Sequence, residues 1–298
     1  MNLKRDQERA AWLQAADTPL LEGDFFEQII RAIYTAILQP GDLAVDCGAN
    51  VGLHTMPMSN LVGPFGRVLA IEAIPEMAES LAFHTRGGSY TNIEVVPKAI
   101  GSREGRATFS WVKGLPGWSG LRQRADLSPG LETSVATIEV PITTLDSLLA
   151  NSRHRVRFVK MDLEGGEYHA LQGAASMLKN HRPLVIFENG REPAARLYGY
   201  TREDWFALFE GADFVVFDLF GRPFLPERWH ARGIPYYFIA AARGSDDERF
   251  VRLELGDVIR TVNRWHQLKR LRHRIRQWTK RRVPEALLRW YLDRRAKG

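Results

Sequence analysis

The sequence contains a single cysteine among 298 residues, so no internal disulfide can form. No apolar run reaches the roughly 18–20 residues that a membrane-spanning helix needs. The first residues, MNLKRDQERAAWLQ, are charged and lack the apolar segment of a secretory signal. We therefore predict a cytoplasmic protein. Cys47 lies in the apolar run 43–47, which favours a small buried strand residue over a nucleophile.

Signatures of several other enzyme classes are absent as well. Neither the G-x-G-x-x-G dinucleotide pattern nor the G-x-x-x-x-G-K-[ST] phosphate loop occurs. With one cysteine and scattered histidines, the chain does not support a Cys/His zinc site. These absences argue against a dehydrogenase, and we expect no metal site.

Positive charge is concentrated at the C-terminus. Residues 260–298 contain fourteen Lys or Arg against two acids, a net charge of about +12, whereas the whole chain carries +6. The remainder is therefore negative by about 6. The overall basic character belongs to this tail and says nothing about the core.

Apolar spacing and turn residues predict strands that alternate with helices. The strands are expected at 42–47, 67–72, 92–96, 98–100, 107–111, 135–141, 156–163, 183–188, 214–218 and 235–240. The helices are expected at 24–38 (with Asp24 as N-cap), from the turn 48–52 to about 61, and at 75–86, 144–149, 167–179 and 201–210.

The strands are continuously apolar rather than alternating, which indicates a parallel sheet covered on both faces. We predict an α/β fold with a doubly wound, mostly parallel sheet, an N-terminal helix and a basic helical C-terminal tail. The expected parts are an N-terminal helical segment (1–40), a cofactor-binding domain (41–245) and the tail (246–298). The Gly- and Pro-rich segment 112–134 is a long loop, typical of a lid or substrate-binding insertion.

The turn after the first strand is the candidate cofactor site, because open parallel sheets bind ligands at the carboxyl ends of their strands. It reads Asp46-Cys47-Gly48-Ala49-Asn50-Val51-Gly52. Glycine at 48 allows a tight turn and Gly52 allows close helix packing. Glu72 ends the second strand, where a carboxylate can accept hydrogen bonds from both ribose hydroxyls. This spacing fits a dinucleotide or an adenosyl cofactor, and Asp46 favours the latter because it would meet an amino acid's ammonium but repel a pyrophosphate.

Several motifs in register with the strands resemble the FkbM family of methyltransferases between about Asp42 and Asn189. They are VDCGANVGLHT, VLAIEAIPE, NIEVVPKAIGSREG, TLDSLL, VRFVKMDLEGGEYHALQGA and PLVIFEN. The resemblance implies a Rossmann-like class I fold that uses S-adenosyl-L-methionine (SAM), commonly to methylate a hydroxyl of a sugar or natural product. By position it places Asp46, Gly48, Asn50 and Gly52 around the methionine part, Glu72 and Ala73 at the ribose, and Lys98 and Ala99 near the adenine.

Methyl transfer to a hydroxyl needs a base within hydrogen-bond reach. Asp162 and Glu164 end the fourth core strand on the cleft side, and either is a candidate; both could instead cap the helix that begins near Glu167. Such a carboxylate cluster could also hold a divalent ion, although our expectation is none. Weaker candidates for substrate contact, each with a packing or solvated alternative, are Lys160, Glu188, Trp118 and His54.

The tail spaces Val262, Trp265, Leu268 and Trp278 as an amphipathic basic helix, with a second helix after Pro284. It suits an anionic membrane surface, with nucleic acid less favoured, or it packs its apolar stripe on the domain. The predicted function is a SAM-dependent O-methyltransferase acting on a sugar, glycan precursor or natural product. The alternative is a non-catalytic protein that keeps the fold and acts through these helices.

Overall fold

The computed structural model describes residues 19–86, 90–123 and 134–267, with side chains described from residue 25 onward. The chain divides into two compact units, Met1–Gly256 and Asp257–Gly298. In the second unit the described residues 257–267 are helical, and the helices predicted around Pro284 lie outside the described residues. The expected boundaries after residues 40 and 245 stay predictions.

A seven-stranded sheet forms the centre of the first unit, in the order β3-β2-β1-β7-β8-β10-β9. Its members are β1 (Leu43–Cys47), β2 (Arg67–Ile71), β3 (Ile93–Val96), β7 (Val156–Met161), β8 (Leu184–Glu188), β9 (Phe214–Asp218) and β10 (Tyr237–Ala242). All neighbouring pairs are parallel except those of β10, which is antiparallel to both β8 and β9. The predicted mostly parallel sheet is confirmed, and the strand order reverses direction between β1 and β7.

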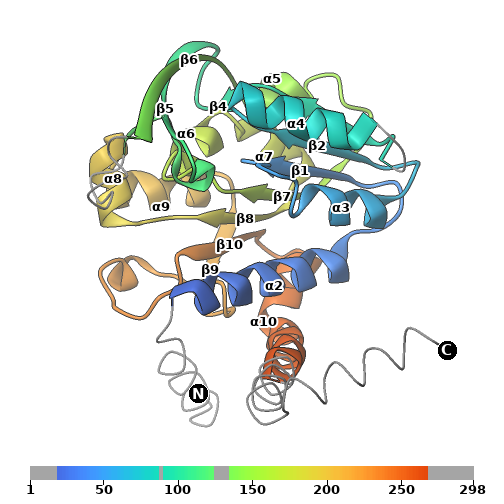
Figure 1. The fold of residues 1–298 in the computed structure, drawn as a ribbon. Helices are drawn as coiled ribbons and strands as arrows, with labels where there is room; N and C mark the ends of the chain where they lie inside the picture. Colours follow the sequence, from blue (N-terminus) through green and yellow to red (C-terminus); the bar gives the residue numbers. More distant parts are fainter. Residues whose placement is uncertain (1–18, 87–89, 124–133, 268–298) are drawn as a thin grey trace, which may run out of the picture. The chain divides into compact units, whose positions relative to one another are not determined.

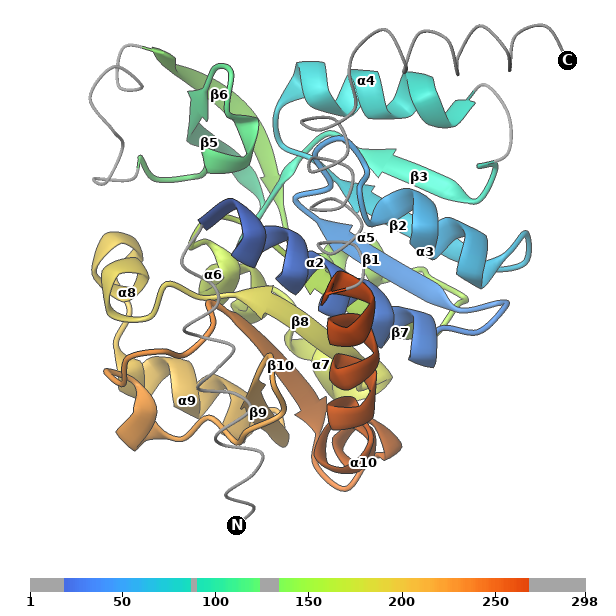
Figure 2. The same cartoon turned by 60° about the horizontal axis from the view of Figure 1, so that its bottom comes forward.

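Helices cover both faces of this sheet, as the continuous apolar strands predict. Figures 1 and 2 show one set of helices along one face and another set along the other. The first set is α2 (Pro19–Ile37), α3 (Thr55–Val62) and α4 (Pro75–Arg86); the second is α5 (Leu145–Leu149), α6 (Glu167–Gln172), α7 (Ala175–His181) and α9 (Arg202–Gly211). Two further helices of this unit are α8 (Glu192–Tyr198) and α10 (Asp246–Leu253). A bidentate ion pair of Arg157 with Asp247, with both N–O distances 2.6 Å, ties α10 to β7.

A second, three-stranded sheet was not predicted from the sequence. It pairs β4 (Ala99–Ile100) with β6 (Val135–Thr143), and β6 in turn with β5 (Gly105–Val112). Each strand falls on an expected extended segment, but the spacing gave no sign that they leave the main sheet. A short 3-10 helix, η1 (Pro116–Trp118), lies in the long loop, of which residues 124–133 are outside the described part.

Three helix predictions were wrong in their boundaries. Asp24 is not an N-cap, because α2 already includes Pro19. The helix after the glycine turn begins only at Thr55, so His54 is its N-cap rather than one turn inside it. The helix predicted over 167–179 is two helices, since Gly173 lies where a Cβ would come within 2.2 Å of the Gly101 carbonyl oxygen.

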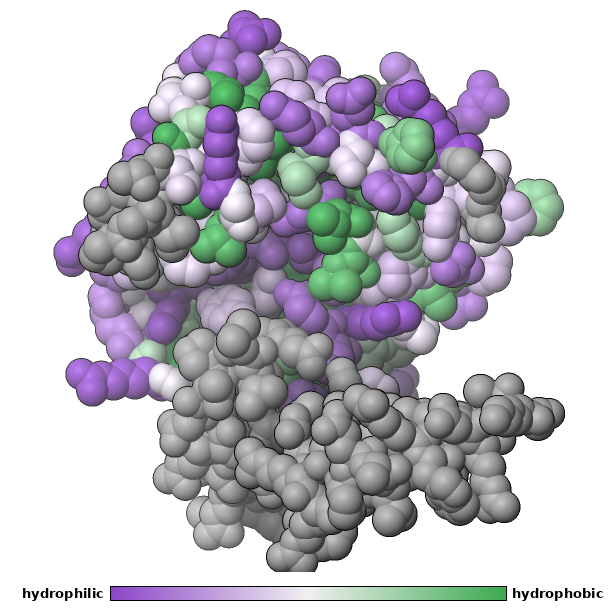
Figure 3. Space-filling model, viewed as in Figure 1, coloured by the Kyte–Doolittle hydropathy of each residue, from purple (hydrophilic) through white to green (hydrophobic). Residues whose placement is uncertain are grey.

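The described surface is mainly polar, as expected when most apolar residues are buried in the interior. On the described part of the face in Figure 3, polar side chains (purple) predominate and apolar ones (green) form small separate groups. Cys47 is fully buried, as predicted, and burial raises the pKa of its thiol far above the usual range. Among the described residues, no helix is both long and apolar enough to cross a bilayer.

Candidate active site

A cavity of about 250 Å³ lies at the carboxyl ends of β1, β2 and β7. This is the place where strand order reverses, and open parallel sheets bind ligands there because the loops of the two halves part. Nearly all the residues predicted to contact cofactor or substrate line this cavity: Asp46, Gly48, Asn50, His54, Glu72, Ala73, Lys98, Ala99, Lys160, Asp162 and Glu164. Gly52, Trp118 and Glu188 are not part of its wall.

Asp46 places a carboxylate with one open oxygen at the end of β1. The side chain is 1% exposed, and its Oδ2 accepts a hydrogen bond of 2.6 Å from the Thr55 hydroxyl. Its Oδ1 has no hydrogen-bond partner among the described residues. A buried anionic oxygen without a donor is costly, so this atom fits a ligand that brings a donor, such as an ammonium group.

The turn from β1 to α3 has a backbone that few residues other than glycine can adopt. Gly48 has φ +79°, and a Cβ there would lie 2.0 Å from the carbonyl oxygen of Asp162. Asn50 also has positive φ, at 48°. Gly52 faces away from the cavity, and its hydrogen leaves room for Leu81 of α4. Gly48 therefore keeps the backbone beside the cavity free of a side chain, whereas Gly52 allows α4 to pack closely against the turn before α3.

Glu72 is held in place by the chain itself. Its Oε2 accepts from the Asn50 N–H and its Oε1 from the Ile74 N–H, both at 2.9 Å. Burial raises the pKa of this carboxyl, while the backbone N–H groups oppose the rise. Each oxygen keeps a second lone pair, so the carboxylate can still accept hydrogen bonds from two neighbouring hydroxyls.

One end of the cavity is apolar, and most of its residues were missed by the sequence analysis. Ile74, Ala99 and Phe109 belong to one buried cluster against the second sheet, with Ala73 and Leu121 packed on it. Of these, only Ala73 and Ala99 had been predicted. Phe109 comes from β5, whose separate sheet could not be recognised from spacing.

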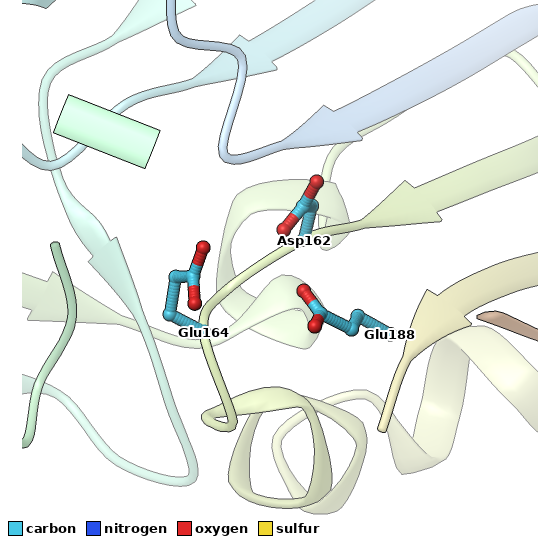
Figure 4. A group of neighbouring side chains, drawn as sticks. All are labelled: Asp162, Glu164 and Glu188. Carbon is cyan, nitrogen blue, oxygen red and sulfur yellow. The ribbon is translucent and has the colours of Figure 1, made fainter. Parts of the chain in front are cut away.

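The opposite end gathers carboxyl groups from two strand ends. One oxygen from each of Asp162, Glu164 and Glu188 lies within 4.8 Å of the others. Figure 4 shows the carboxyl group of Glu188, which comes from β8, pointing toward the two that follow β7. Glu188 thus adjoins the cavity through Asp162 rather than lining it. Oxygen ligands at this spacing could also hold a divalent cation.

The pKa values of Asp162 and Glu188 are shifted in opposite directions. Burial and then the charges of Asp162 and Glu164 raise the pKa of Glu188 well above its usual value. Burial also disfavours charge on Asp162, but Lys160 and hydrogen bonds from Tyr237 and Glu188 hold the pKa of Asp162 below its usual value. Asp162 is therefore the charged acceptor of this pair, and the upward shift of the Glu188 pKa favours Glu188 as its donor.

Asp162 and Glu164 do not cap the following helix. The N-cap of α6 is Gly166, which makes no side-chain capping bond. Instead, Glu167 folds back and accepts from the Leu163 N–H at 2.6 Å, and burial raises the pKa of Glu167 to about 8. Glu164 has positive φ (52°), so the backbone turns it toward the cavity rather than along the helix.

The other candidates have mixed positions. Lys160 pairs with Asp46 across the β1–β7 ladder, and its Nζ lies 3.3 Å from Asp162 Oδ2, so it is not a solvated lysine. His54 is packed, 4% exposed, with its Nε2 against Glu27 Oε2. Trp118 lies on η1 and is 37% exposed, while its neighbours Pro116, Gly117 and Ser119 line the cavity.

Two polar residues at this site were missed by the sequence analysis. Tyr237 donates to Asp162 Oδ2 at 2.8 Å, and its hydroxyl also lies 3.1 Å from Glu27 Oε1. Tyr237 begins β10, and because β10 is antiparallel, its first residue pairs with Glu188 at the edge where the parallel strands end. Glu27 lies among apolar residues of α2, where the sequence carries no motif.

The comparison with known families agrees with this geometry. The model of the methyltransferase FkbM domain matches residues 46–216, more than half of the chain. The chain belongs to the FkbM methyltransferase family. The resemblance inferred from the motifs is confirmed, and the chain carries a SAM-dependent methyltransferase domain.

Individual relatives match shorter stretches. The protein-L-isoaspartate O-methyltransferase of Methanococcus aeolicus is 34% identical over 87 residues, which are 27% of this chain and 39% of that protein. The wheat (Triticum aestivum) enzyme of the same name is 30% identical over 118 residues, 39% of this chain and 45% of that protein. This chain thus spans less than half the length of these curated relatives.

Solved structures show similarity at low sequence identity. Methyltransferase FkbM from Methylobacillus flagellatus is 17% identical, with 70% of this chain and 49% of that chain covered and a TM-score of 0.40. Fibrillarin from Aeropyrum pernix, solved with bound SAM, is 12% identical, with coverages of 73% and 76% and a TM-score of 0.40.

The described residues fit SAM. Asp46 offers an unpartnered buried oxygen for the ammonium, and Gly48 leaves backbone space where a side chain would collide. Glu72 can accept from both ribose hydroxyls, and the apolar end suits the adenine. The cofactor, when bound, supplies a methyl group on a positively charged sulfur.

Proposed function

We propose that this protein transfers the methyl group of SAM to a hydroxyl oxygen of a sugar, a glycan precursor or a natural product. The observation that carries this proposal is the continuity of the cavity: carboxylates suited to the cofactor lie at one part, and the acidic cluster Asp162, Glu164 and Glu188 adjoins another. Acidic side chains are suited to receive hydroxyl donors.

Asp162 serves as the base. It is charged at neutral pH because Lys160 lies beside it, so it can accept a hydrogen bond from the acceptor hydroxyl and orient the oxygen. A weak base is sufficient, because the oxygen becomes strongly acidic as the bond to the methyl carbon forms. Glu164 lines the same cavity and is the second candidate for this role.

The named relatives methylate a carboxylate according to their names, which makes protein isoaspartate the competing acceptor. The acidic cluster argues against it. A substrate carboxylate would have to enter beside Asp162 and Glu164, and a further negative charge next to these acids is disfavoured by like-charge repulsion. A neutral hydroxyl has no such penalty.

The test combines binding and turnover. Calorimetry with S-adenosylhomocysteine separates the two alternatives. We expect an enzyme to bind this compound and a non-catalytic protein with the same fold not to bind it. Labelled methyl transfer is then measured on methyl glycosides, on inositol and on an isoaspartyl peptide, with and without a chelator. We expect label on a glycoside or polyol; label on the peptide alone would refute the hydroxyl assignment.

Two variants decide which acid is the base. Asp162→Asn should bind S-adenosylhomocysteine like the wild type and lower kcat about 10²–10⁴-fold, the usual contribution of a general base. Glu164→Gln should have a smaller effect. A larger loss of kcat in Glu164→Gln than in Asp162→Asn would assign the base to Glu164. If the chelator abolishes the activity of the wild type, a metal ion is bound at the acidic cluster.

A further inference from the structure

A chain of polar contacts leads from Asp162 to Glu27, at another point of the cavity wall. Asp162 accepts from the Tyr237 hydroxyl at 2.8 Å, and this hydroxyl lies 3.1 Å from Glu27 Oε1. The other oxygen of Glu27 contacts Nε2 of His54, whose Nδ1 lies 3.4 Å from the Tyr34 hydroxyl. Residues from the ends of β7 and β10, from α2 and from the start of α3 thus form one connected network.

The Tyr237 hydroxyl has one proton for two carboxylates. Tyr237 is 3% exposed, and burial together with the charges of Asp162 and Glu27 raises its pKa far above the usual range, so the phenol stays neutral. Asp162 receives that proton as a hydrogen bond while it is charged. Once Asp162 itself gains a proton, it can donate to the Tyr237 oxygen, and the Tyr237 proton can turn to its second partner, Glu27 Oε1.

We propose that Tyr237 and Glu27 form a proton exit from the base, with Tyr237 as the relay and Glu27 as the point of release. The proposal rests on the proposed function, in which Asp162 takes the proton of the acceptor hydroxyl. Both residues lie outside the matched residues 46–216, so the family match assigns them no role.

The transfer balances in atoms and charge. Bound SAM would supply the methyl group; the acceptor oxygen would bond to the methyl carbon as the carbon–sulfur bond breaks, and the electron pair of that bond would stay on sulfur. The hydroxyl proton passes to the Asp162 carboxylate. Asp162 then donates it to the Tyr237 oxygen while the phenol proton moves to Glu27 Oε1, and Glu27 releases one proton to water for each methyl transferred.

Burial and charge fit this direction. The Asp162 side chain lies among ionisable groups, namely Lys160, Glu164, Glu167, Glu188 and Tyr237. The side chains of Glu27 and Asp162 are 28% and 25% exposed, and both line the cavity, whereas His54 is 4% exposed. With the acceptor hydroxyl held against Asp162, Glu27 is the carboxylate of the network that is left to exchange a proton with water. His54 fixes the orientation of Glu27, and the charge of Lys160 favours loss of the proton from Asp162.

The test uses Tyr237→Phe, which removes only the hydroxyl, and Glu27→Gln, which keeps the size of the side chain but cannot hold the proton. Tyr168→Phe is the matched control, because Tyr168 is also buried with a bonded hydroxyl, but that hydroxyl is bonded to Gln172 and not to Asp162 or Glu27. The measurements are S-adenosylhomocysteine binding and the pH profile of kcat and KM with the methyl glycoside that the wild type methylates fastest.

We expect each variant to lower kcat about 10–100-fold with cofactor binding unchanged. In Tyr237→Phe, Asp162 loses a donor to its charged form, so the acidic limb of the profile moves to higher pH by about one unit. The double variant should be no slower than the slower single variant, because both act on one path.

Two results would overturn the exit, and they are distinguishable. If the wild type is active and both variants behave like Tyr168→Phe, then Asp162 exchanges its proton with the cavity directly and the exit is wrong. If the wild type methylates no hydroxyl acceptor, the proposed function fails first, and the exit has no proton to carry.

Discussion

Polar residues in this site divide into those held by the protein and those left for a ligand. Glu72 has both oxygens engaged by backbone N–H groups, which fixes its position before any ligand arrives. Asp46 has one oxygen engaged and one open. A site arranged in this way binds with little reorganisation, because its anchor points do not have to be ordered on binding.

Glu72→Ala should therefore weaken S-adenosylhomocysteine binding by about 1–3 kcal/mol, the usual value of charge-assisted hydrogen bonds. Calorimetry would show this as a roughly 5- to 150-fold rise in Kd. Glu76→Ala, an exposed position one turn further on, is the control and should bind like the wild type. Equal affinities for the two variants would mean that Glu72 does not contact the ligand.

Residue-level prediction from the sequence succeeded where a parallel strand ends. Asp46 lies near the end of β1, and Glu72 and Asp162 directly follow its two neighbours in the sheet, β2 and β7; parallel strands bring their carboxyl ends to one edge. The same rule could not find Tyr237, which begins an antiparallel strand, or Glu27, which comes from a helix that crosses the sheet. The spacing of residues along the sequence does not predict contacts that depend on how a helix or strand is oriented in the fold.

At the scale of elements, strand positions were predictable and their assignment to sheets was not. The segments of β4, β5 and β6 read as extended pieces, but the second sheet they form depends on long-range pairing. Helix breaks depend on tertiary contacts in the same way. Gly173 separates α6 from α7 because the chain there passes against the Gly101 carbonyl.

Gly173→Ala tests that account. The added Cβ would lie 2.2 Å from the Gly101 carbonyl oxygen, so the backbone must move, and we expect a loss of about 1–3 kcal/mol in the free energy of unfolding. Gly211→Ala is the matched control, since nothing lies within 4 Å of its added Cβ. Urea unfolding measures both; a Gly173→Ala variant as stable as the control would show that the α6–α7 junction can shift freely.

At the scale of the whole molecule, charge is divided between the units more sharply than the total suggests. About +12 lies in residues 260–298, against about −6 for the rest of the chain. The acidic part includes the cavity wall, with Glu27, Asp46, Glu72, Asp162 and Glu164 against Lys98 and Lys160. The acidic wall suits a cationic cofactor, and the basic residues 260–298 are the candidate contact with an anionic surface.

We propose that the basic tail binds anionic membranes, and the whole chain tests this against residues 1–256. The full chain should sediment with vesicles that contain phosphatidylserine and should be released by salt, since each Lys or Arg near the surface contributes about 1 kcal/mol. Residues 1–256 form a compact unit and should stay in solution while binding S-adenosylhomocysteine like the full chain. Vesicles of phosphatidylcholine alone control for apolar insertion. Equal sedimentation of both proteins would place any membrane contact elsewhere, and sedimentation of neither would leave the tail as a partner of the domain or of another polyanion.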